Sequence, residues 1–124
     1  MKYLCLAYEE EDLFKAMPHE QWLALRQETL DYVESLKDSG NLIATHALQS
    51  ARNGVLVRVR NQSLLTSDGP FAETKEQLGG IFLIEAHDFN EALRIASQWP
   101  SARLGTIEVR PVENTLREDN RYGD

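Results

Sequence analysis

The sequence lacks the cysteine and histidine clusters on which small disulfide-bonded or metal-binding domains depend. Its 124 residues include one cysteine, Cys5, which lies in an apolar run. A single thiol forms no disulfide within the chain, and no neighbouring base activates it, so we expect Cys5 in the core. The three histidines, His19, His46 and His87, lack the spacing of metal ligands. We therefore expect a cytoplasmic protein without a bound metal or other cofactor.

The sequence also lacks an excess of basic residues and any long hydrophobic run. Thirteen Lys and Arg residues stand against twenty Asp and Glu residues, which gives a net charge of −7. Nucleic-acid backbones are bound by clustered Lys and Arg, whereas the basic residues here are scattered. The apolar run at the N-terminus is too short for a signal peptide or a membrane span. Neither nucleic acid nor a membrane is an expected partner.

What the sequence does have is the length of one compact domain and clear helical and extended patterns. Apolar residues recur at three- and four-residue steps in 18–37 and 88–99, which predicts two amphipathic helices. Gly40 suits the left-handed cap of the first helix, and Asp88 and Glu91 have the spacing of a capping box at the second. Strands are expected at residues 3–8, 42–48, 54–60, 81–86 and 106–110.

We interpret this order as the β-α-β-β-α-β arrangement of ferredoxin-like α+β folds, an antiparallel sheet with both helices on one face. The sheet face without helices has a mixed character, because Leu56 alternates with Arg58 and Arg60. A lone sheet would leave such a face partly exposed, which predicts that a second sheet packs there. We therefore expect a homodimer whose interface includes this strand, with the charged residues lining a cleft.

The stretch DGPFAETKEQLGG, Asp68 to Gly80, carries a resemblance to a known family. With MKYLCL before it and DFNEALRIASQWP and GTIEVRPV after it, the sequence resembles the YCII-related, or DGPF-domain, family of small bacterial proteins. The resemblance runs over residues 1–112 and implies a dimeric α+β barrel in which two sheets pack face to face. Residues 113–124 lose the hydrophobic pattern and are expected to form a flexible tail.

The resemblance also implies two kinds of activity. Compact YCII-type relatives are thought to be enzyme-like, with a His–Asp pair in a cleft, and the Asp of that pair matches Asp68. The histidine of that pair belongs to the first helix, where this sequence has only His19 at the very start, so no catalytic histidine is transferred. Some DGPF members are encoded beside, or fused to, extracytoplasmic-function sigma factors, which implies a regulatory partner.

The residues around Asp68 fit two interpretations, a simple turn or a functional site. Asp-Gly-Pro is a common turn, but Glu73, Lys75 and Glu76 follow closely. A carboxylate near a lysine and a second acid is a setting in which the pKa values of the groups are shifted apart, as acid–base catalysis requires. The arginines of the uncovered face suit an anionic ligand, but an ion-pair network at the dimer interface with Glu85 and Glu108 is the favoured interpretation. The candidate catalytic residue is Asp68, and the candidate ligand-binding residues are Gly69, Pro70, Phe71, Glu73, Lys75, Arg58, Arg60 and Arg110.

Two smaller features carry structural interpretations. Gly79 and Gly80 lack the context of a phosphate-binding loop and are read as room for a close backbone approach at the start of a strand. His46 lies among alternating residues and is read as a strand histidine rather than a base. The sequence thus favours a dimer that binds a small polar or anionic molecule beside the DGPF loop, with Asp68 as a candidate for acid–base catalysis. The alternative is a non-enzymatic regulatory module that acts through a protein partner such as a sigma factor.

Overall fold

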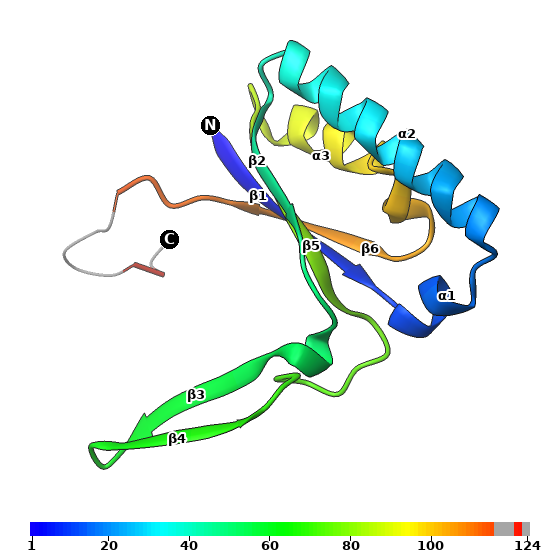
Figure 1. Ribbon diagram of the computed structural model, residues 1–124. Helices are drawn as coiled ribbons and strands as arrows, with labels where there is room; N and C mark the ends of the chain where they lie inside the picture. Colours follow the sequence, from blue (N-terminus) through cyan, green and yellow to red (C-terminus); the bar gives the residue numbers. More distant parts are fainter. Residues whose placement is uncertain (116–120, 123–124) are drawn as a thin grey trace.

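The structure, a computed structural model, describes residues 1–115 and 121–122 and has an α+β fold (Figure 1). Its strands are β1 (Lys2–Glu9), β2 (Leu42–Ala47), β3 (Val55–Arg60), β4 (Ser63–Asp68), β5 (Gln77–Glu85) and β6 (Thr106–Pro111). Its α-helices are α1 (Glu11–Ala16), α2 (His19–Asp38) and α3 (Phe89–Ser97), and short 3₁₀ helices span Ala51–Asn53 and Pro100–Arg103. None of the described helices is both long and apolar enough to cross a bilayer.

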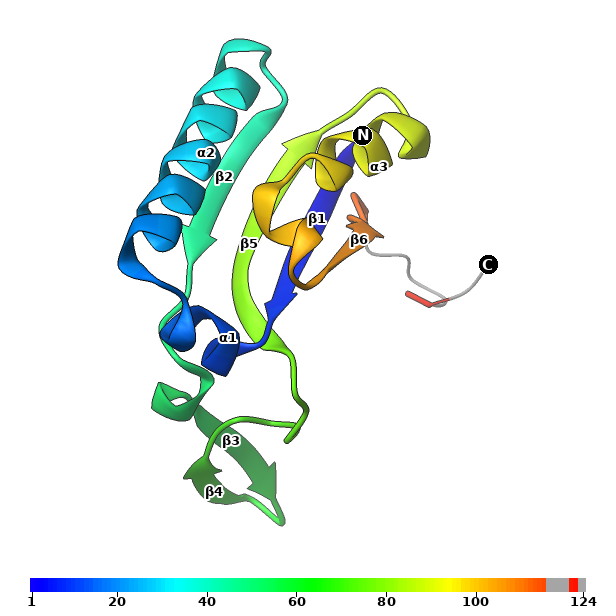
Figure 2. The same cartoon turned by 90° about the vertical axis from the view of Figure 1, so that its right-hand side faces the viewer.

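Four strands form one antiparallel sheet in the order β2-β5-β1-β6. Helices α2 and α3 both lie on the same side of this sheet (Figures 1 and 2). Counted over the strands of this sheet and the helices α2 and α3, the chain follows the order β-α-β-β-α-β, so the expected α+β architecture with an antiparallel sheet is confirmed. The six-residue helix α1 was not predicted, because it is too short to show a periodicity.

The expectation that residues 54–60 belong to this sheet is wrong. The segment does form a strand, but β3 pairs with β4 alone, from Val55 opposite Asp68 to Arg60 opposite Ser63. Asn61 and Gln62 join the two strands with φ values of 50° and 65°, the left-handed values that a two-residue hairpin turn requires. Leu56, Arg58 and Arg60 therefore lie on a separate two-stranded hairpin, here called the hairpin arm (residues 55–68).

The core lies between the four-stranded sheet and the helices. Phe82 of β5 is fully buried and stacks on Trp99, with ring centroids 4.0 Å apart and an interplanar angle of 8°. The Tyr32 hydroxyl of α2 donates a 2.7 Å hydrogen bond to the carbonyl of Ile95, which ties α2 to α3. Cys5 of β1 is fully buried, as expected, and burial raises the pKa of its thiol to about 12.

The ends of the two long helices follow the sequence signals closely. Gly40 has φ of +82° and takes the left-handed conformation beyond α2. At the start of α3, the Asp88 carboxylate accepts a 2.8 Å hydrogen bond from the Glu91 amide, which is half of the expected capping box. The Glu91 carboxylate instead accepts from the Asn41 side-chain amide at 3.1 Å and links α3 to the segment after α2. The expected flexible tail, 113–124, lies partly outside the described residues.

Candidate functional site

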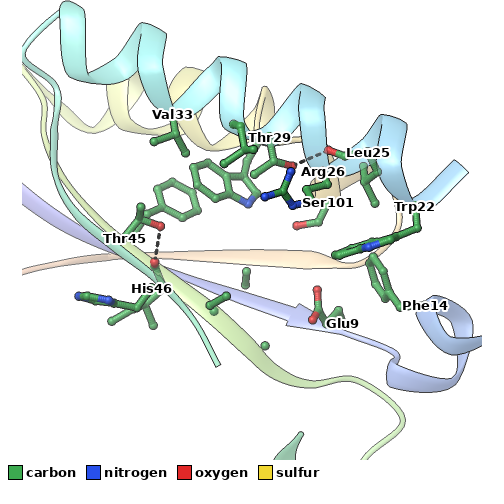
Figure 3. A pocket seen from close by; sticks show the side chains of 18 residues that line it. Glu9, Phe14, Trp22, Leu25, Arg26, Thr29, Val33, Thr45, His46 and Ser101 are labelled. Carbon is green, nitrogen blue, oxygen red and sulfur yellow. Dashed lines mark hydrogen bonds between the residues drawn. The ribbon is translucent and has the colours of Figure 1, made fainter. Parts of the chain in front are cut away.

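A cavity of about 490 Å³ lies between α2 and the helix-covered face of the sheet (Figure 3). At one end, Phe14 of α1 and Trp22 of α2 contact each other edge to face, with ring centroids 6.5 Å apart. The stacked rings of Phe82 and Trp99 also line the cavity. A largely apolar space of this size suits a small organic molecule.

The wall formed by α2 is held in place at its side by polar contacts. The Arg103 guanidinium donates hydrogen bonds of 2.8 Å from Nη1 and Nη2 to the two carboxylate oxygens of Glu28, which joins the 3₁₀ helix Pro100–Arg103 to α2. Two hydroxyls that line the cavity already donate hydrogen bonds of 2.9 Å to backbone carbonyls, that of Thr29 to Leu25 and that of Thr45 to Ile81. The polar groups left for a ligand belong to other side chains.

Glu9, the last residue of β1, supplies the one carboxylate among the described residues that line this cavity. Residues 3, 5 and 7 of the strand point to the buried face, and Glu9 continues that alternation. The register between β1 and β5 shifts after Ala7, and this shift leaves Gly79 as an unpaired residue beside Glu9. A Cβ atom on Gly79 would overlap the Glu9 carboxylate, so the missing side chain makes room for that group.

The same close approach explains the Gly-Gly pair. A Cβ atom on Gly80 would lie 3.1 Å from the His46 carbonyl oxygen of the neighbouring strand. Both glycines lie within β5, near its start; the predicted close backbone approach is confirmed at Gly80, whereas the close neighbour of Gly79 is the Glu9 side chain. The imidazole of His46 points away from the cavity (Figure 3), as expected for a residue whose strand position pairs with Ile81 on the other face.

The environment of Glu9 disfavours its charged form. Loss of hydration on burial raises the pKa of the Glu9 carboxyl above its ordinary value, and the nearby charge of Glu11 raises it further. Among the described residues, none donates a hydrogen bond or forms an ion pair with the Glu9 carboxylate. Arg26 and Ser101 also line the cavity, and their side chains point into it (Figure 3). A carboxylate without a partner in an apolar cavity is a group that a ligand can satisfy.

We predict that Glu9→Gln stabilises the protein at neutral pH. Because the pKa of Glu9 is raised in the folded state, the stability linked to its protonation is present below the unfolded pKa of about 4.3 and is lost as pH rises through the folded pKa. The neutral Gln avoids that loss. Urea unfolding should show Glu9→Gln more stable than the wild type at pH 7, with the difference smaller at pH 3.5.

The control for this measurement is Glu73→Gln, which makes the same change of net charge at an exposed side chain. The prediction fails if the two variants behave alike at both pH values, because net charge alone would then explain the effect.

A second cavity, of about 520 Å³, lies beside the DGPF loop at the root of the hairpin arm. Gly69, Pro70 and Phe71, three of the predicted ligand-binding residues, line it. The Gly69 amide donates a 2.8 Å hydrogen bond to the Gly54 carbonyl, and a Cβ atom on Gly69 would lie 3.0 Å from that oxygen. This cavity, which Tyr8 and Leu78 of the main sheet also line, is called the DGPF groove below.

The remaining residues predicted for the loop site do not converge in the monomer. Asp68 is exposed at the end of β4, opposite Val55. Glu73 is exposed, and Lys75 forms an exposed ion pair with Glu10 at 3.7 Å. Within the described residues, Asp68, Glu73 and Lys75 line neither of the two cavities. A catalytic role for Asp68 stays a prediction.

The predicted arginines are also separated. Arg58 lies over the Phe71 ring, 5.8 Å from its centroid, and Arg60 donates to the Val59 carbonyl at 3.0 Å. Arg110 is on β6 and donates from Nε to Glu108 of its own strand at 3.0 Å. The Glu108 carboxylate raises the pKa of Arg110 above its ordinary value. Ligand binding by these arginines stays a prediction.

Sequence reasoning missed Glu9, although a signal for it was present. The alternation of the first strand, continued by two residues, places position 9 on the buried face. The residue was passed over because it opens the acidic run Glu9–Asp12, which looks like a solvated surface segment. In the part of the chain that the structure describes, no group of three or more His, Cys, Asp or Glu residues is arranged to hold a metal ion.

Comparisons with known proteins find sequence similarity over most of the chain. A family model described as the YCII-related domain matches residues 1–115. The uncharacterized protein R00369 of Rhizobium meliloti (strain 1021) is 31% identical over 114 residues, which are 90% of this chain and 92% of that relative. The match to the family model extends over all the described strands and helices, including the hairpin arm.

Proposed function

We propose that this chain, which belongs to the YCII-related domain family, binds a small organic molecule in the cavity under α2 and recognises it through Glu9. The observation that carries this proposal is the Glu9 carboxylate itself, which has no partner among the described residues and a raised pKa inside a largely apolar space. Carboxyl groups in cavities whose pKa is shifted by their surroundings are candidates for functional sites.

The lining of the cavity favours a ligand with one acidic group on an apolar body. The guanidinium of Arg26 suits a carboxylate or another planar anion, and the Ser101 hydroxyl offers a further hydrogen bond. The aromatic rings of Trp22, Phe82 and Trp99 suit the apolar body. Glu9 accepts a hydrogen bond from a donor at the other end of the ligand. The proposed ligand class is therefore a small carboxylic acid that also carries a hydroxyl or amine group.

A raised pKa also equips Glu9 for proton transfer. General bases work best when their pKa lies close to the working pH, and burial moves the Glu9 carboxyl in that direction. In this proposal, Glu9 accepts the proton of the ligand's hydroxyl or ammonium group and returns it to the same atom, so that no bond to carbon changes and no oxidant is needed. Asp68, which precedes the three loop residues that line the DGPF groove, is the second candidate for the same role.

We also propose that two copies pair through the sheet face that no described helix covers. Leu4, Leu6, Ile81 and Leu83 share this face, in register with one another, and are only partly buried. We call these four residues the open sheet face. An apolar face of this kind favours packing against a second sheet, which is the dimeric α+β barrel that the family resemblance implies.

The alternative function, a regulatory module acting through a protein partner such as an extracytoplasmic-function sigma factor, draws on the exposed side chains of the hairpin arm. Such a module needs no occupied cavity under α2. Ligand binding at Glu9 therefore separates the two functions.

The test is a thermal-shift screen with small hydroxy and amino carboxylic acids on the wild type and three variants. A ligand that binds the native state raises its midpoint in proportion to occupancy. Loss of a charged hydrogen bond costs roughly 1.5–3 kcal/mol, so Glu9→Gln should weaken binding by at least about tenfold. Asp12→Asn, an exposed acid of the same run, and Asp68→Asn should retain the ligand-induced shift.

Each outcome points to one site. A shift that persists in Glu9→Gln but disappears in Asp68→Asn moves the ligand to the DGPF groove and overturns the role of Glu9. A shift that all variants retain equally overturns both sites. The comparison uses the ligand-induced shift of each variant, because Glu9→Gln is expected to change the midpoint without ligand.

A further inference from the structure

Helix α1 lies at one end of the cavity under α2 and is held loosely. It connects the end of β1 to the start of α2 (Figures 1 and 2). All six of its residues are described and none of them is buried, whereas α2 and α3 both contain buried residues. A helix of this length is marginal in water without support from packing. The conformation of α1 therefore depends on the contacts that its side chains make with other elements.

One of these contacts lies in the wall of the cavity. Phe14 is the one residue of α1 that lines the cavity, and its ring meets the Trp22 ring of α2 edge to face (Figure 3). Trp22 belongs to a helix that is fixed, because the Arg103 guanidinium binds Glu28 of α2 through two hydrogen bonds of 2.8 Å. The Phe14 ring is therefore a loosely held part of the wall that rests against a firmly held part.

The residues at both ends of α1 are extended and suit hinges. Glu10 before the helix has φ of −87° and ψ of 108°, and Met17 after it has φ of −66° and ψ of 133°. Hinges are a few residues at the ends of elements that absorb backbone rotation. The ion pair between Glu10 and Lys75 of the DGPF loop spans 3.7 Å, and exposed pairs of this kind contribute little to stability. Helix α1 is thus a short segment between two hinges, and this ion pair restrains it only weakly.

We propose that α1 is a lid of the cavity under α2, which closes over a bound ligand by placing Phe14 against Trp22. This inference rests on the ligand binding of the proposed function and adds the element that retains the ligand. The structure has the closed arrangement, in which the two rings are in contact. Rotation about Glu10 and Met17 separates the rings and opens this end of the cavity, while β1 stays paired with β5 and β6.

The position of Glu9 gives the reason why a ligand favours the closed lid. Only Glu10 separates Glu9 from α1, and in the closed arrangement loss of hydration and the charge of Glu11 both raise the pKa of the Glu9 carboxyl. Opening the lid returns water to Glu9 and moves Glu11 away, which favours the open lid in the empty protein. A ligand that donates a hydrogen bond to Glu9 removes this advantage. A ligand shifts a conformational equilibrium only through such a difference in affinity for the two states.

The first experiment measures amide hydrogen exchange in the chain alone. The reporter is the Met17 amide, which donates a 3.3 Å hydrogen bond to the Phe14 carbonyl and exchanges when the opened α1 loses its support. Loss of the aromatic contact in Phe14→Ala should speed this exchange roughly threefold or more. Leu13→Ala is the matched control, since Leu13 lies on the same helix and is exposed, and it should leave the exchange nearly unchanged. Alanine is the best helix former, so neither variant speeds exchange through helix propensity.

The second experiment repeats the measurement with para-hydroxyphenylacetate, a hydroxy acid with an aromatic body, as the probe. The probe should slow exchange of the Met17 amide in the wild type and in Leu13→Ala, because it favours the closed lid. The slowing should be smaller in Phe14→Ala, which lacks the closing contact. It should also be lost in Glu9→Gln, which lacks the carboxylate that couples the ligand to the lid.

The outcomes separate this inference from the proposed function. Equal exchange of the Met17 amide in Phe14→Ala and Leu13→Ala overturns the lid, because α1 then frays without regard to the Phe14 contact. A probe that raises the thermal midpoint of the wild type but leaves the Met17 exchange unchanged also overturns the lid, while ligand binding at Glu9 stands. A probe that changes neither quantity contradicts the proposed ligand class, and the two variants without ligand then decide whether α1 opens at Phe14.

Discussion

Phe82→Ala is expected to lower the free energy of unfolding by about 3–5 kcal/mol, the range for truncating a buried aromatic side chain. Phe82 has no exposed surface, and its ring stacks on Trp99. Removal leaves the Trp99 ring without its partner, and because Phe82 also lines the cavity under α2, the new space is added to one that already exists. The surroundings are therefore poorly placed to collapse onto the gap.

Denaturant unfolding of Phe82→Ala and Phe71→Ala measures this effect against a matched control. Phe71 is 74% exposed, so its truncation should change stability by no more than about 0.5 kcal/mol in the monomer. A loss below about 1 kcal/mol for Phe82→Ala would contradict the packing of α3 and Trp99 on the sheet. Both variants are measured at a protein concentration at which the chain is monomeric.

The second large effect is expected from Gly105→Ala, which should cost about 3 kcal/mol through overpacking. A Cβ atom on Gly105 would overlap the carbonyl oxygen of Tyr8 and lie 3.4 Å from the Cα atom of Glu9. Both obstacles are backbone atoms of β1, so no side-chain rotation relieves the overlap. The start of β6 must move away from β1 and strain the pairing of Thr106 with Tyr8.

Gly79→Ala is the informative comparison for this variant. Its obstacle is the Glu9 carboxylate, the far end of a flexible side chain that can rotate away. Thermal unfolding should therefore show a clearly lower midpoint for Gly105→Ala than for Gly79→Ala. Equal midpoints would show that β1 and β6 yield as easily as a side chain does, which would contradict the close backbone contact.

The helices and the main sheet were predictable because their signals are local. Periodicity marked α2 and α3, and Gly40 and Asp88 marked their ends. The strand β3 was equally clear, but alternation identifies a strand without naming its neighbour. Its partner β4 was missed because Ser63–Asp68 does not alternate, its two leucines being adjacent, and because the turn Asn61–Gln62 lacks the glycine that usually signals a two-residue hairpin.

The site was harder to predict, because it depends on contacts between distant segments. Asp68, Glu73 and Lys75 are close in sequence, yet at the end of the hairpin and in the loop that follows it they are exposed and lie outside both cavities. Glu9 becomes distinctive only when α2 encloses it and Gly79, seventy residues later, leaves room for its carboxylate. Local clustering of charge was therefore a weaker guide than the alternation of one strand.

The buried thiol of Cys5 has a practical consequence for all these measurements. Thiol reagents attack the thiolate, and Cys5 has neither access nor a low pKa in the folded chain. It lies in β1 between β5 and β6, so it is reached only when the centre of the sheet opens. The rate at which a maleimide labels Cys5 therefore reports opening of this core. The variants can be compared by this rate without introducing another cysteine or a fused tag.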